Sequence, residues 1–272
     1  MTDLPVSSSA RSALDVALET IREVGALVRG RFYSAKEIAY KGPSNMVTDV
    51  DMEAEAFIKG ALSREFPRMG FLGEESGAAG SDDGFRWIVD PVDGTRNYAA
   101  GVPHFAISMA LADGPAVLLG VTYDPMRDEL FHAVRGHGAF LNGAPISASK
   151  RTAVADTLVG FDMSGADVRA ACALTLVQGL WPGVQSLRVM GSATLGLAYA
   201  AAGRVDIFFH HTLAPWDVAA GLVLLDEAGG QMVDRRSGGP ATLRSTGVVA
   251  SSPELLAEFL RLTQGEEWYT VE

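Results

Sequence analysis

Disulfide bonds cannot stabilise this fold, because Cys172 is the only cysteine among 272 residues. It lies in the apolar segment AACALTLV, where we expect a small, buried hydrophobic side chain. The sequence also lacks an uncharged apolar run near the roughly 20 residues that a membrane helix needs. The segment MTDLPVSSSA has neither the basic nor the apolar region of a signal peptide. We therefore expect a cytoplasmic protein that does not contact a membrane.

Positive charge is scarce as well. The 22 Lys and Arg residues are outnumbered by 33 Asp and Glu, and the formal net charge of −11 opposes attraction to nucleic acid or an anionic membrane. An anionic substrate would therefore need a divalent cation to reverse the local sign of charge. The G-x-x-x-x-G-K-[ST] motif of P-loop kinases and ATPases is missing, and His104, His132 and His137 lack zinc-ligand spacing.

What the sequence does contain is typical of one large globular unit over residues 1–272, since 48% of the residues are hydrophobic and 20% are charged. Apolar residues at steps of three and four predict helices over roughly residues 10–32 and from Thr48 or Asp49 to about Phe66. In the second helix the residues that we expect to be buried are Met52, Phe57, Ile58, Ala61 and Leu62.

Two patterns of secondary structure follow, and they predict a subdomain seam near residue 152. Before it, the runs RWIVD, FAISMALAD, AVLLGVTYD and ELFHAVR predict a largely antiparallel sheet with a hairpin at Asn142-Gly143, which makes 1–152 an α+β half. After it, 153–272 forms an α/β half. Its expected strands are TLVGFD, SLRVMG, RVDIFFH and GVVAS, and its expected helices lie near 166–180, 192–202 and 216–228. We interpret 34–45 and 77–85 as surface loops, with lids as the alternative.

The segment WIVDPVDG combines features of a ligand site. Asp90 follows a short apolar run, Pro91 fixes one φ angle, and Gly94 permits an unusual turn or a close approach to a ligand. Asp90 and Asp93 would then face the same space. A helix starting near Gly94-Thr95 would aim free N–H groups at an anion beside them. In the structural alternative, Asp90 forms a turn and Asp93 caps a helix.

Two further acids extend this set. Glu74 and Glu75 follow an apolar strand end in FLGEES, where ordinary surface acids are the alternative. Asp217 stands at a helix start in PWDVAAG, where a simple N-cap is the alternative. Together, Glu74, Asp90, Asp93 and Asp217 would form an all-oxygen site suited to Mg²⁺ or Mn²⁺ rather than zinc.

GEES, DPVDGTRNY and WDVAAG, in this order and at these separations, resemble the inositol monophosphatase family of metal-dependent, lithium-sensitive phosphatases. The stretch from Lys41 through NMVTDVD to Asp51 resembles the family's N-terminal motif. The resemblance covers nearly the whole chain. It implies a layered αβαβα sandwich of mixed α+β and α/β character, and usually a homodimer.

The resemblance also implies a set of metal ligands. Glu74, Asp90 and the Val92 carbonyl would bind one ion, and Asp90, Asp93 and Asp217 a second. Glu74 would contribute to a third, weaker site. The expected ion is Mg²⁺, two or three per active site, with Mn²⁺ as the alternative.

Catalytic and substrate contacts follow from the same resemblance. Thr95 and Asp51, with Glu74, would activate the attacking water, and the Gly94 and Thr95 N–H groups would hold the phosphate. The structural alternatives are a first-turn helix residue for Thr95 and a helix-surface acid for Asp51. The rest of the substrate would contact Asp93, Asp217 and the segment Gly191-Ser192-Ala193, for which a strand-to-helix turn capped by Ser192 also fits.

His210 departs from the family pattern, because members acting on inositol phosphate commonly have a glutamate seven residues before the WD aspartate. A histidine donates as well as accepts and titrates near neutral pH, so the contacts on the sugar side should differ. On a strand, His210 and His211 would face opposite ways, and we expect His210 to line the pocket.

We therefore expect a Mg²⁺-dependent phosphatase that hydrolyses inositol monophosphate or a similar polyol or sugar phosphate. Fructose 1,6-bisphosphate and histidinol phosphate are the alternative substrates for the same mechanism. Asn97-Tyr98 weighs against phosphoadenosine phosphate. An alternative of another class is a non-catalytic metal-binding protein that serves regulation or interaction.

Overall fold

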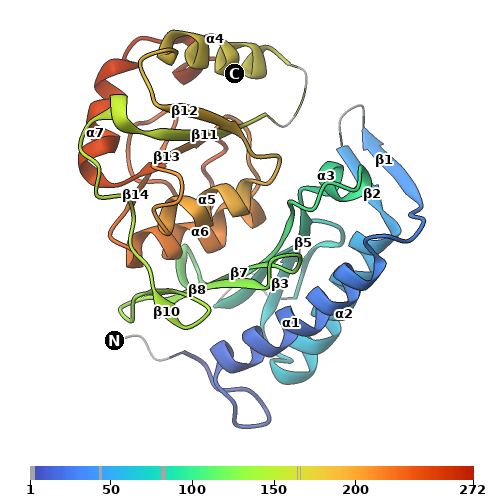
Figure 1. Cartoon of the computed structure of the whole chain (residues 1–272). Coiled ribbons are helices and arrows are strands. Elements are labelled where there is room, and N and C mark those ends of the chain that lie inside the picture. Colours follow the sequence, from blue (N-terminus) through green and yellow to red (C-terminus); the bar gives the residue numbers. More distant parts are fainter. Residues whose placement is uncertain (1–3, 43–44, 81–83, 164, 166) are drawn as a thin grey trace.

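The computed structural model describes residues 4–42, 45–80, 84–163, 165 and 167–272, and in this part of the chain helices and sheets alternate in five layers (Figure 1). The outer helices of the first layer are α1 (Ala13–Arg31) and α2 (Asp49–Glu65). The middle layer holds α5 (Ala193–Ala201) and α6 (Pro215–Glu227), and the last holds α4 (Val168–Leu180) and α7 (Pro253–Leu262). The predicted αβαβα architecture is confirmed.

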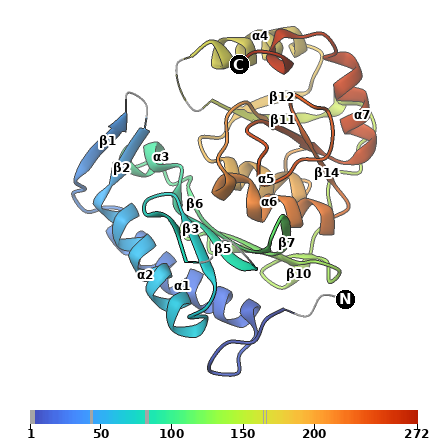
Figure 2. The ribbon, with the colours of Figure 1, turned by 180° about the vertical axis from the view of Figure 1, so that it is seen from behind.

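An eight-stranded sheet lies between α1–α2 and the middle helices (Figure 2). Its strands, in spatial order, are β10 (Ala144–Pro145), β9 (Ala139–Leu141), β8 (Glu129–Val134), β7 (Ala116–Asp124), β6 (Ala106–Asp113), β5 (Phe85–Asp93), β3 (Gly70–Gly73) and β4 (Gly77–Ala79). Only β3 and β5 pair in parallel among these described neighbours. The predicted antiparallel character is confirmed, and so is the hairpin, where Asn142 and Gly143 both have positive φ.

A five-stranded sheet lies on the other side of α5 and α6. Its strands, in spatial order, are β12 (Ser186–Val189), β11 (Leu158–Asp162), β13 (Ile207–His210), β15 (Val248–Ser251) and β14 (Gln231–Asp234). β11 pairs in parallel with both β12 and β13, as expected of an α/β arrangement. β14 and α7 were not among the predicted elements, and the seam near residue 152 stays a prediction.

The shorter elements complete the chain. They are the hairpin β1 (Ile38–Gly42) and β2 (Asn45–Thr48), the one-turn helix α3 (Thr95–Ala99), and the 3₁₀ turns η1 (Val154–Asp156) and η2 (Glu267–Tyr269). The segments 34–45 and 77–85 are therefore not plain loops, because they contain β1, the start of β2 and β4. Residues 43–44 and 81–83 of these segments lie outside the described residues. None of the helices in the described ranges has the length and apolar content needed to cross a bilayer.

The buried face of α2 differs from the prediction. Ile58, Ala61 and Leu62 are buried as expected, but Met52 is 52% exposed and Phe57 37%. The buried stripe instead contains two acids, Asp51 at 1% and Glu55 at 2% exposure. The prediction was wrong because it assigned the buried face of α2 from hydrophobic residues alone. Asp51 and Glu55 are buried there because each has hydrogen-bond partners at the site described below.

Close contact between α6 and the eight-stranded sheet requires glycine in β7. A Cβ atom at Gly120 would lie 2.7 Å from the Ala220 carbonyl oxygen and 2.7 Å from Val223 Cγ1 of α6. Gly60, inside α2, has only the end of the Arg64 side chain within 4 Å.

We therefore expect Gly120→Ala to lower the free energy of unfolding by about 1–3 kcal/mol, because α6 must move away from the sheet. Gly60→Ala is the matched control and should raise it by about 0.5–1 kcal/mol, since alanine favours a helix interior. Urea unfolding of the two variants beside the wild type measures both changes. A Gly120→Ala variant as stable as Gly60→Ala would contradict the packing.

Candidate active site

A β-bulge brings Asp90 and Asp93 to the same side of the sheet. Residues three apart on a regular strand face opposite sides. In β5, however, Asp90 pairs with Ser108 and Asp93 with Ala106, so one extra residue is inserted between them. The Asp90 carboxylate accepts a hydrogen bond from the Val92 N–H at 3.0 Å, which holds the bulge closed.

The third aspartate comes from a distant part of the chain. Asp217 lies in the first turn of α6, where its carboxylate accepts a hydrogen bond of 2.6 Å from the Ala214 N–H. Asp90, Asp93 and Asp217 each offer an oxygen atom, and these atoms lie within 4.8 Å of one another. The N-caps are Gly94 for α3 and Ala214 for α6, so neither Asp93 nor Asp217 is a simple N-cap residue.

Glu74 completes the acidic group from a third segment. It follows the end of β3, and its backbone N–H donates to the Val89 carbonyl at 3.2 Å. Because β3 runs parallel to β5, with Gly73 beside Val89, Glu74 emerges at the same edge of the sheet as Asp90. Glu74 lines the same cavity as Asp93 and Asp217.

The electrostatics of this group favour a cation. Burial is the main cause that raises the pKa of Asp90 well above its usual range, and the charges of Glu74, Asp93, Asp217 and Asp51 add to it. The pKa of Asp217 is also raised, by burial and then by Asp93. These carboxylates cannot all be ionised together without a compensating positive charge. An all-carboxylate donor set fits a hard divalent ion such as Mg²⁺ or Mn²⁺.

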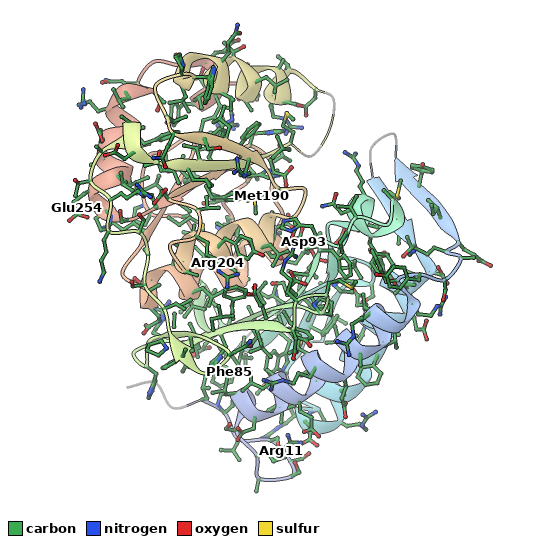
Figure 3. The ribbon with its side chains drawn as sticks, in the orientation of Figure 1. Arg11, Phe85, Asp93, Met190, Arg204 and Glu254 are labelled. Atoms are coloured by element: carbon green, nitrogen blue, oxygen red, sulfur yellow. The ribbon has the colours of Figure 1, made fainter. Side chains whose placement is uncertain are left out.

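Asp93 is held in place by the segment that begins α5. It accepts hydrogen bonds from Ser192 Oγ (2.5 Å), Thr194 Oγ1 (2.6 Å), the Thr194 N–H (2.8 Å) and the Ala193 N–H (3.3 Å). Ser192 is also the N-cap of α5, as the structural alternative for Gly191-Ser192-Ala193 predicted. Asp93 therefore fixes the position of α5 relative to β5 (Figure 3).

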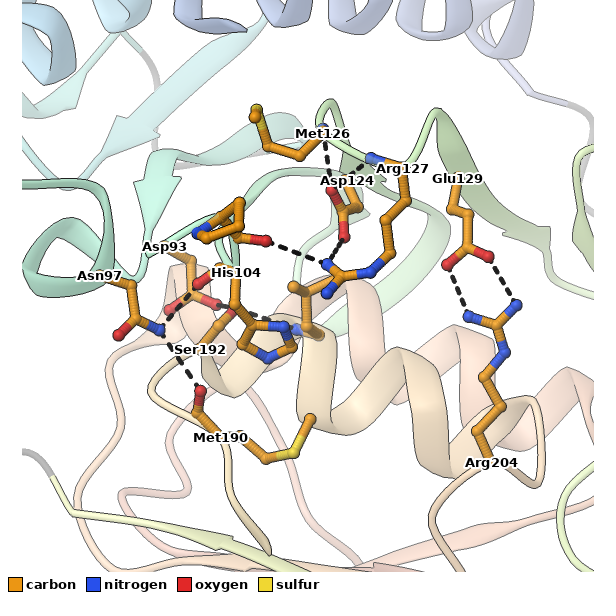
Figure 4. Close-up of polar contacts among 12 residues, drawn as sticks. Asp93, Asn97, His104, Asp124, Met126, Arg127, Glu129, Met190, Ser192 and Arg204 are labelled. Atoms are coloured by element: carbon orange, nitrogen blue, oxygen red, sulfur yellow. Dashed lines mark hydrogen bonds and ion pairs between the residues drawn. The ribbon is translucent and has the colours of Figure 1, made fainter. Parts of the chain in front are cut away.

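Asn97 ties α3 to the same segment. Its side-chain amide donates to the carbonyl oxygens of His104 (2.8 Å), Gly191 (3.1 Å) and Met190 (3.4 Å) (Figure 4). Gly94 is required here because its φ is 92° and a Cβ atom would lie 2.9 Å from the Gly191 carbonyl oxygen. The close approach leaves the turn between β5 and α3 directly against the start of α5.

Thr95 and Asp51 lie in direct contact, as the expected joint role in activating a water molecule requires. Thr95 Oγ1 is 3.1 Å from Asp51 Oδ1 and 3.0 Å from the Val92 carbonyl oxygen. Asp51 lies in the first turn of α2 and also accepts hydrogen bonds from the N–H and hydroxyl of Thr48. Burial raises the pKa of Asp51, so it is not an ordinary surface acid of a helix.

A cavity of about 710 Å³ opens beside the carboxylates, and His210 lines it together with Gly94, Thr95, Gly191 and Ala193. Burial lowers the pKa of His210 to about 3, so the expectation that its ring titrates near neutral pH is wrong. His210 Nδ1 accepts a hydrogen bond of 3.0 Å from the Thr212 N–H, which leaves the proton on Nε2.

The prediction that the His210 and His211 rings face opposite ways is also wrong. β13 ends at His210, so strand alternation does not extend to the next residue. The two rings stack with their centroids 5.3 Å apart and their planes 18° from parallel.

Three residues near the site were missed by the sequence analysis. Thr194 binds Asp93, as described above. Asp162 ends β11 in register with His210 on β13, is buried and lines the cavity, and burial raises its pKa to about 6. Glu55 binds the turn after Glu74. The available signal for Glu55 was an acid on the apolar stripe of α2, while Thr194 and Asp162 carry no such signal in the sequence.

Comparisons with known proteins agree with this site. A family model described as the inositol monophosphatase family matches residues 9–267. The chain is 40% identical to the inositol-1-monophosphatase of Rhizobium meliloti, covering 93% of this chain and 96% of that one. It is 38% identical to the Nus factor SuhB of Escherichia coli K12, covering 91% and 94%. The solved structure of the extragenic suppressor protein suhB from Bartonella henselae is similar at a TM-score of 0.89, with 34% identity over 93% and 98% of the two chains.

Neutralising one buried carboxylate should stabilise the metal-free protein. Asp90→Asn keeps an oxygen that accepts from Val92 but removes a charge that its neighbours repel. The pKa of Asp90 is raised in the folded state, so at about pH 7 its ionised form is a destabilising charge. We expect the free energy of unfolding in the presence of a chelator to rise by at least about 1 kcal/mol.

The same variant should lose the stabilisation that Mg²⁺ gives the wild type, because one ligand is gone. Urea unfolding with chelator and with Mg²⁺ measures both effects, and Asp113→Asn, at an exposed position of β6, is the control. Equal stabilisation of the wild type and Asp90→Asn by Mg²⁺ would show that the ion binds elsewhere.

Proposed function

The chain belongs to the inositol monophosphatase family, and we propose that it is a Mg²⁺-dependent phosphomonoesterase that hydrolyses inositol monophosphate or a similar polyol or sugar phosphate. The observation on which this rests is the meeting of Asp90, Asp93 and Asp217 oxygens within 4.8 Å beside a large cavity. We further propose a cytoplasmic, lithium-sensitive homodimer that binds neither nucleic acid nor membrane, as the family resemblance implies.

The metal ligands in this proposal come from the acidic group. Glu74, Asp90 and the Val92 carbonyl would hold one Mg²⁺, and Asp90, Asp93 and Asp217 a second, with Glu74 also serving a third and Mn²⁺ as a substitute. When bound, the ions supply positive charge to the phosphate and lower the pKa of water. Thr95 has a single hydroxyl proton, which can go either to the Val92 carbonyl or to Asp51, and donation to Asp51 leaves the Val92 carbonyl oxygen for an ion.

Thr95 and Asp51 would move the proton of the attacking water. The contact of 3.1 Å between the hydroxyl and the carboxylate lets Thr95 donate to Asp51 while its own lone pair accepts from water. The raised pKa of Asp51 brings it closer to neutrality, where a general base works best. Phosphate oxygens would accept from the backbone N–H groups of Gly94 and Thr95 at the start of α3.

The alcohol part of the substrate would lie against the far wall of the cavity. His210 there offers a neutral Nε2–H donor, and Asp162 beside it offers an acceptor. The backbone of Gly191-Ser192-Ala193, with Asp93 and Asp217, would contact the hydroxyl groups nearest the phosphate. A polyol can satisfy both donors and acceptors, which favours inositol or sugar phosphates. Fructose 1,6-bisphosphate and histidinol phosphate remain the alternative substrates.

A second candidate function follows from one of the comparisons. The relative named a Nus factor is about as similar to this chain as the relative named a phosphatase. A non-catalytic regulatory or interaction role for this metal-binding fold is therefore the alternative. It would be supported if the wild type binds Mn²⁺ yet hydrolyses no phosphate ester offered to it.

The direct test is phosphate release from inositol 1-phosphate, fructose 1,6-bisphosphate, histidinol phosphate and phosphoadenosine phosphate, with and without Mg²⁺. We expect Mg²⁺-dependent turnover of a polyol or sugar phosphate. Asp93→Asn should lower kcat at least about 100-fold, because charge stabilisation at the phosphate is lost. Asp113→Asn should behave as the wild type. Turnover that does not need Mg²⁺, or that survives in Asp93→Asn, would overturn the proposal.

The protonation state of the His210 ring gives a separate prediction. Because burial lowers its pKa to about 3, the ring loses its proton well below neutral pH and stays neutral above that. An NMR titration of the histidine ring protons should show no transition for His210 between about pH 5.5 and 8. A His210 transition near the ordinary value would mean a charged ring in the substrate pocket.

A further inference from the structure

Glu55 is a buried acid outside the set of proposed metal ligands. It lies on α2 and is 2% exposed, among the apolar residues that pack α2 against the sheet. Both of its oxygens accept hydrogen bonds from backbone groups: Oε2 from the Glu75 N–H and Oε1 from the Ser76 N–H, each at 2.7 Å. Two charge-assisted hydrogen bonds of this kind compensate a carboxylate that burial would otherwise disfavour.

The two N–H groups belong to the residues directly after Glu74. On its other side, the Glu74 N–H donates to the Val89 carbonyl of β5. The turn that presents Glu74 is thus held by β5 before it and by Glu55 after it. Gly73 allows this contact, because a Cβ atom there would lie 2.4 Å from Glu55 Oε2.

We propose that Glu55 is a positioning residue that fixes Glu74 in its metal-binding orientation and so sets the affinity of the site for divalent ions. The inference rests on the proposed metal dependence. A ligand held in place before the ion arrives loses less conformational freedom on binding than one on a loose turn. Residues that orient metal ligands in this way typically change metal affinity about 10–100-fold when they are replaced.

Glu55→Gln tests the contact with the smallest change of shape. The amide keeps one acceptor but places an NH₂ donor against a backbone N–H, so one of the two tethers is lost. The matched control is Glu53→Gln, two residues earlier on α2, where the side chain is exposed and pairs with Arg31 at 2.6 Å. Gly73→Ala is a second variant that crowds the same oxygen and leaves the carboxylate intact.

Mn²⁺ binding measured by electron paramagnetic resonance gives a readout that does not depend on turnover. We expect Glu55→Gln and Gly73→Ala to bind Mn²⁺ about tenfold more weakly than the wild type, and Glu53→Gln to bind as the wild type. The Mg²⁺ concentration for half-maximal phosphate release should rise by a similar factor. At saturating Mg²⁺, kcat should stay within about threefold, because the filled site again orders the turn.

A double-mutant cycle shows whether Glu55 acts through Glu74. In a Glu74→Ala background, Glu55→Gln should change the Mn²⁺ affinity by less than about twofold. A lower unfolding midpoint with unchanged Mn²⁺ affinity of the folded variants would mean a structural role only, and would overturn the inference. A wild type that binds no Mn²⁺ would instead refute the proposed function, so the two failures are distinct.

Discussion

Mutual repulsion among closely spaced carboxylates is the constraint on which the rest of the site depends. Asp90, Asp93 and Asp217 converge to within 4.8 Å, with Glu74 beside them, in a protein that already has a net charge of −11. Backbone hydrogen bonds from Val92, Ala214 and the start of α5 hold the three aspartates in place, but these donors carry no full positive charge. A divalent cation would compensate the negative charge of the carboxylates and would attract an anionic substrate to the site.

Polar side chains at the site also join the layers of the fold. Asp93 reaches from the eight-stranded sheet to α5, and Asn97 reaches from α3 to the loop before α5. Asp217 starts α6, which packs against the same sheet through Gly120. The position of the middle helices therefore decides whether the acids meet. A substitution far from the cavity that shifts α5 or α6 should affect metal binding through this connection.

Much of this arrangement could be predicted from local sequence. Asp90, Asp93 and Gly94 stand in one short motif, and strand runs such as AVLLGVTYD have a clear pattern, so both were found. Glu55 and Asp162 were missed because their roles depend on residues that lie 20 or more positions away in the chain. Glu55 binds the Ser76 N–H, and Asp162 lies beside His210 in the sheet. The burial of Met52 and Phe57 was predicted wrongly for the same reason, since a hydrogen-bonded acid can occupy a buried stripe that hydrophobicity alone assigns to apolar residues. The charge state of His210 likewise depends on tertiary burial, which a sequence does not display.

The central claim is that this cluster of acids is a divalent-metal site. Anomalous scattering from crystals grown with Mn²⁺ and inorganic phosphate tests it most directly, because it locates the ions without relying on turnover. We expect anomalous peaks between Asp90, Asp93 and Asp217, with coordinating oxygens at about 2.0–2.3 Å and the phosphate beside Gly94 and Thr95. Crystals saturated with Mn²⁺ that show no peak among these carboxylates, or show peaks only elsewhere on the protein, would contradict it.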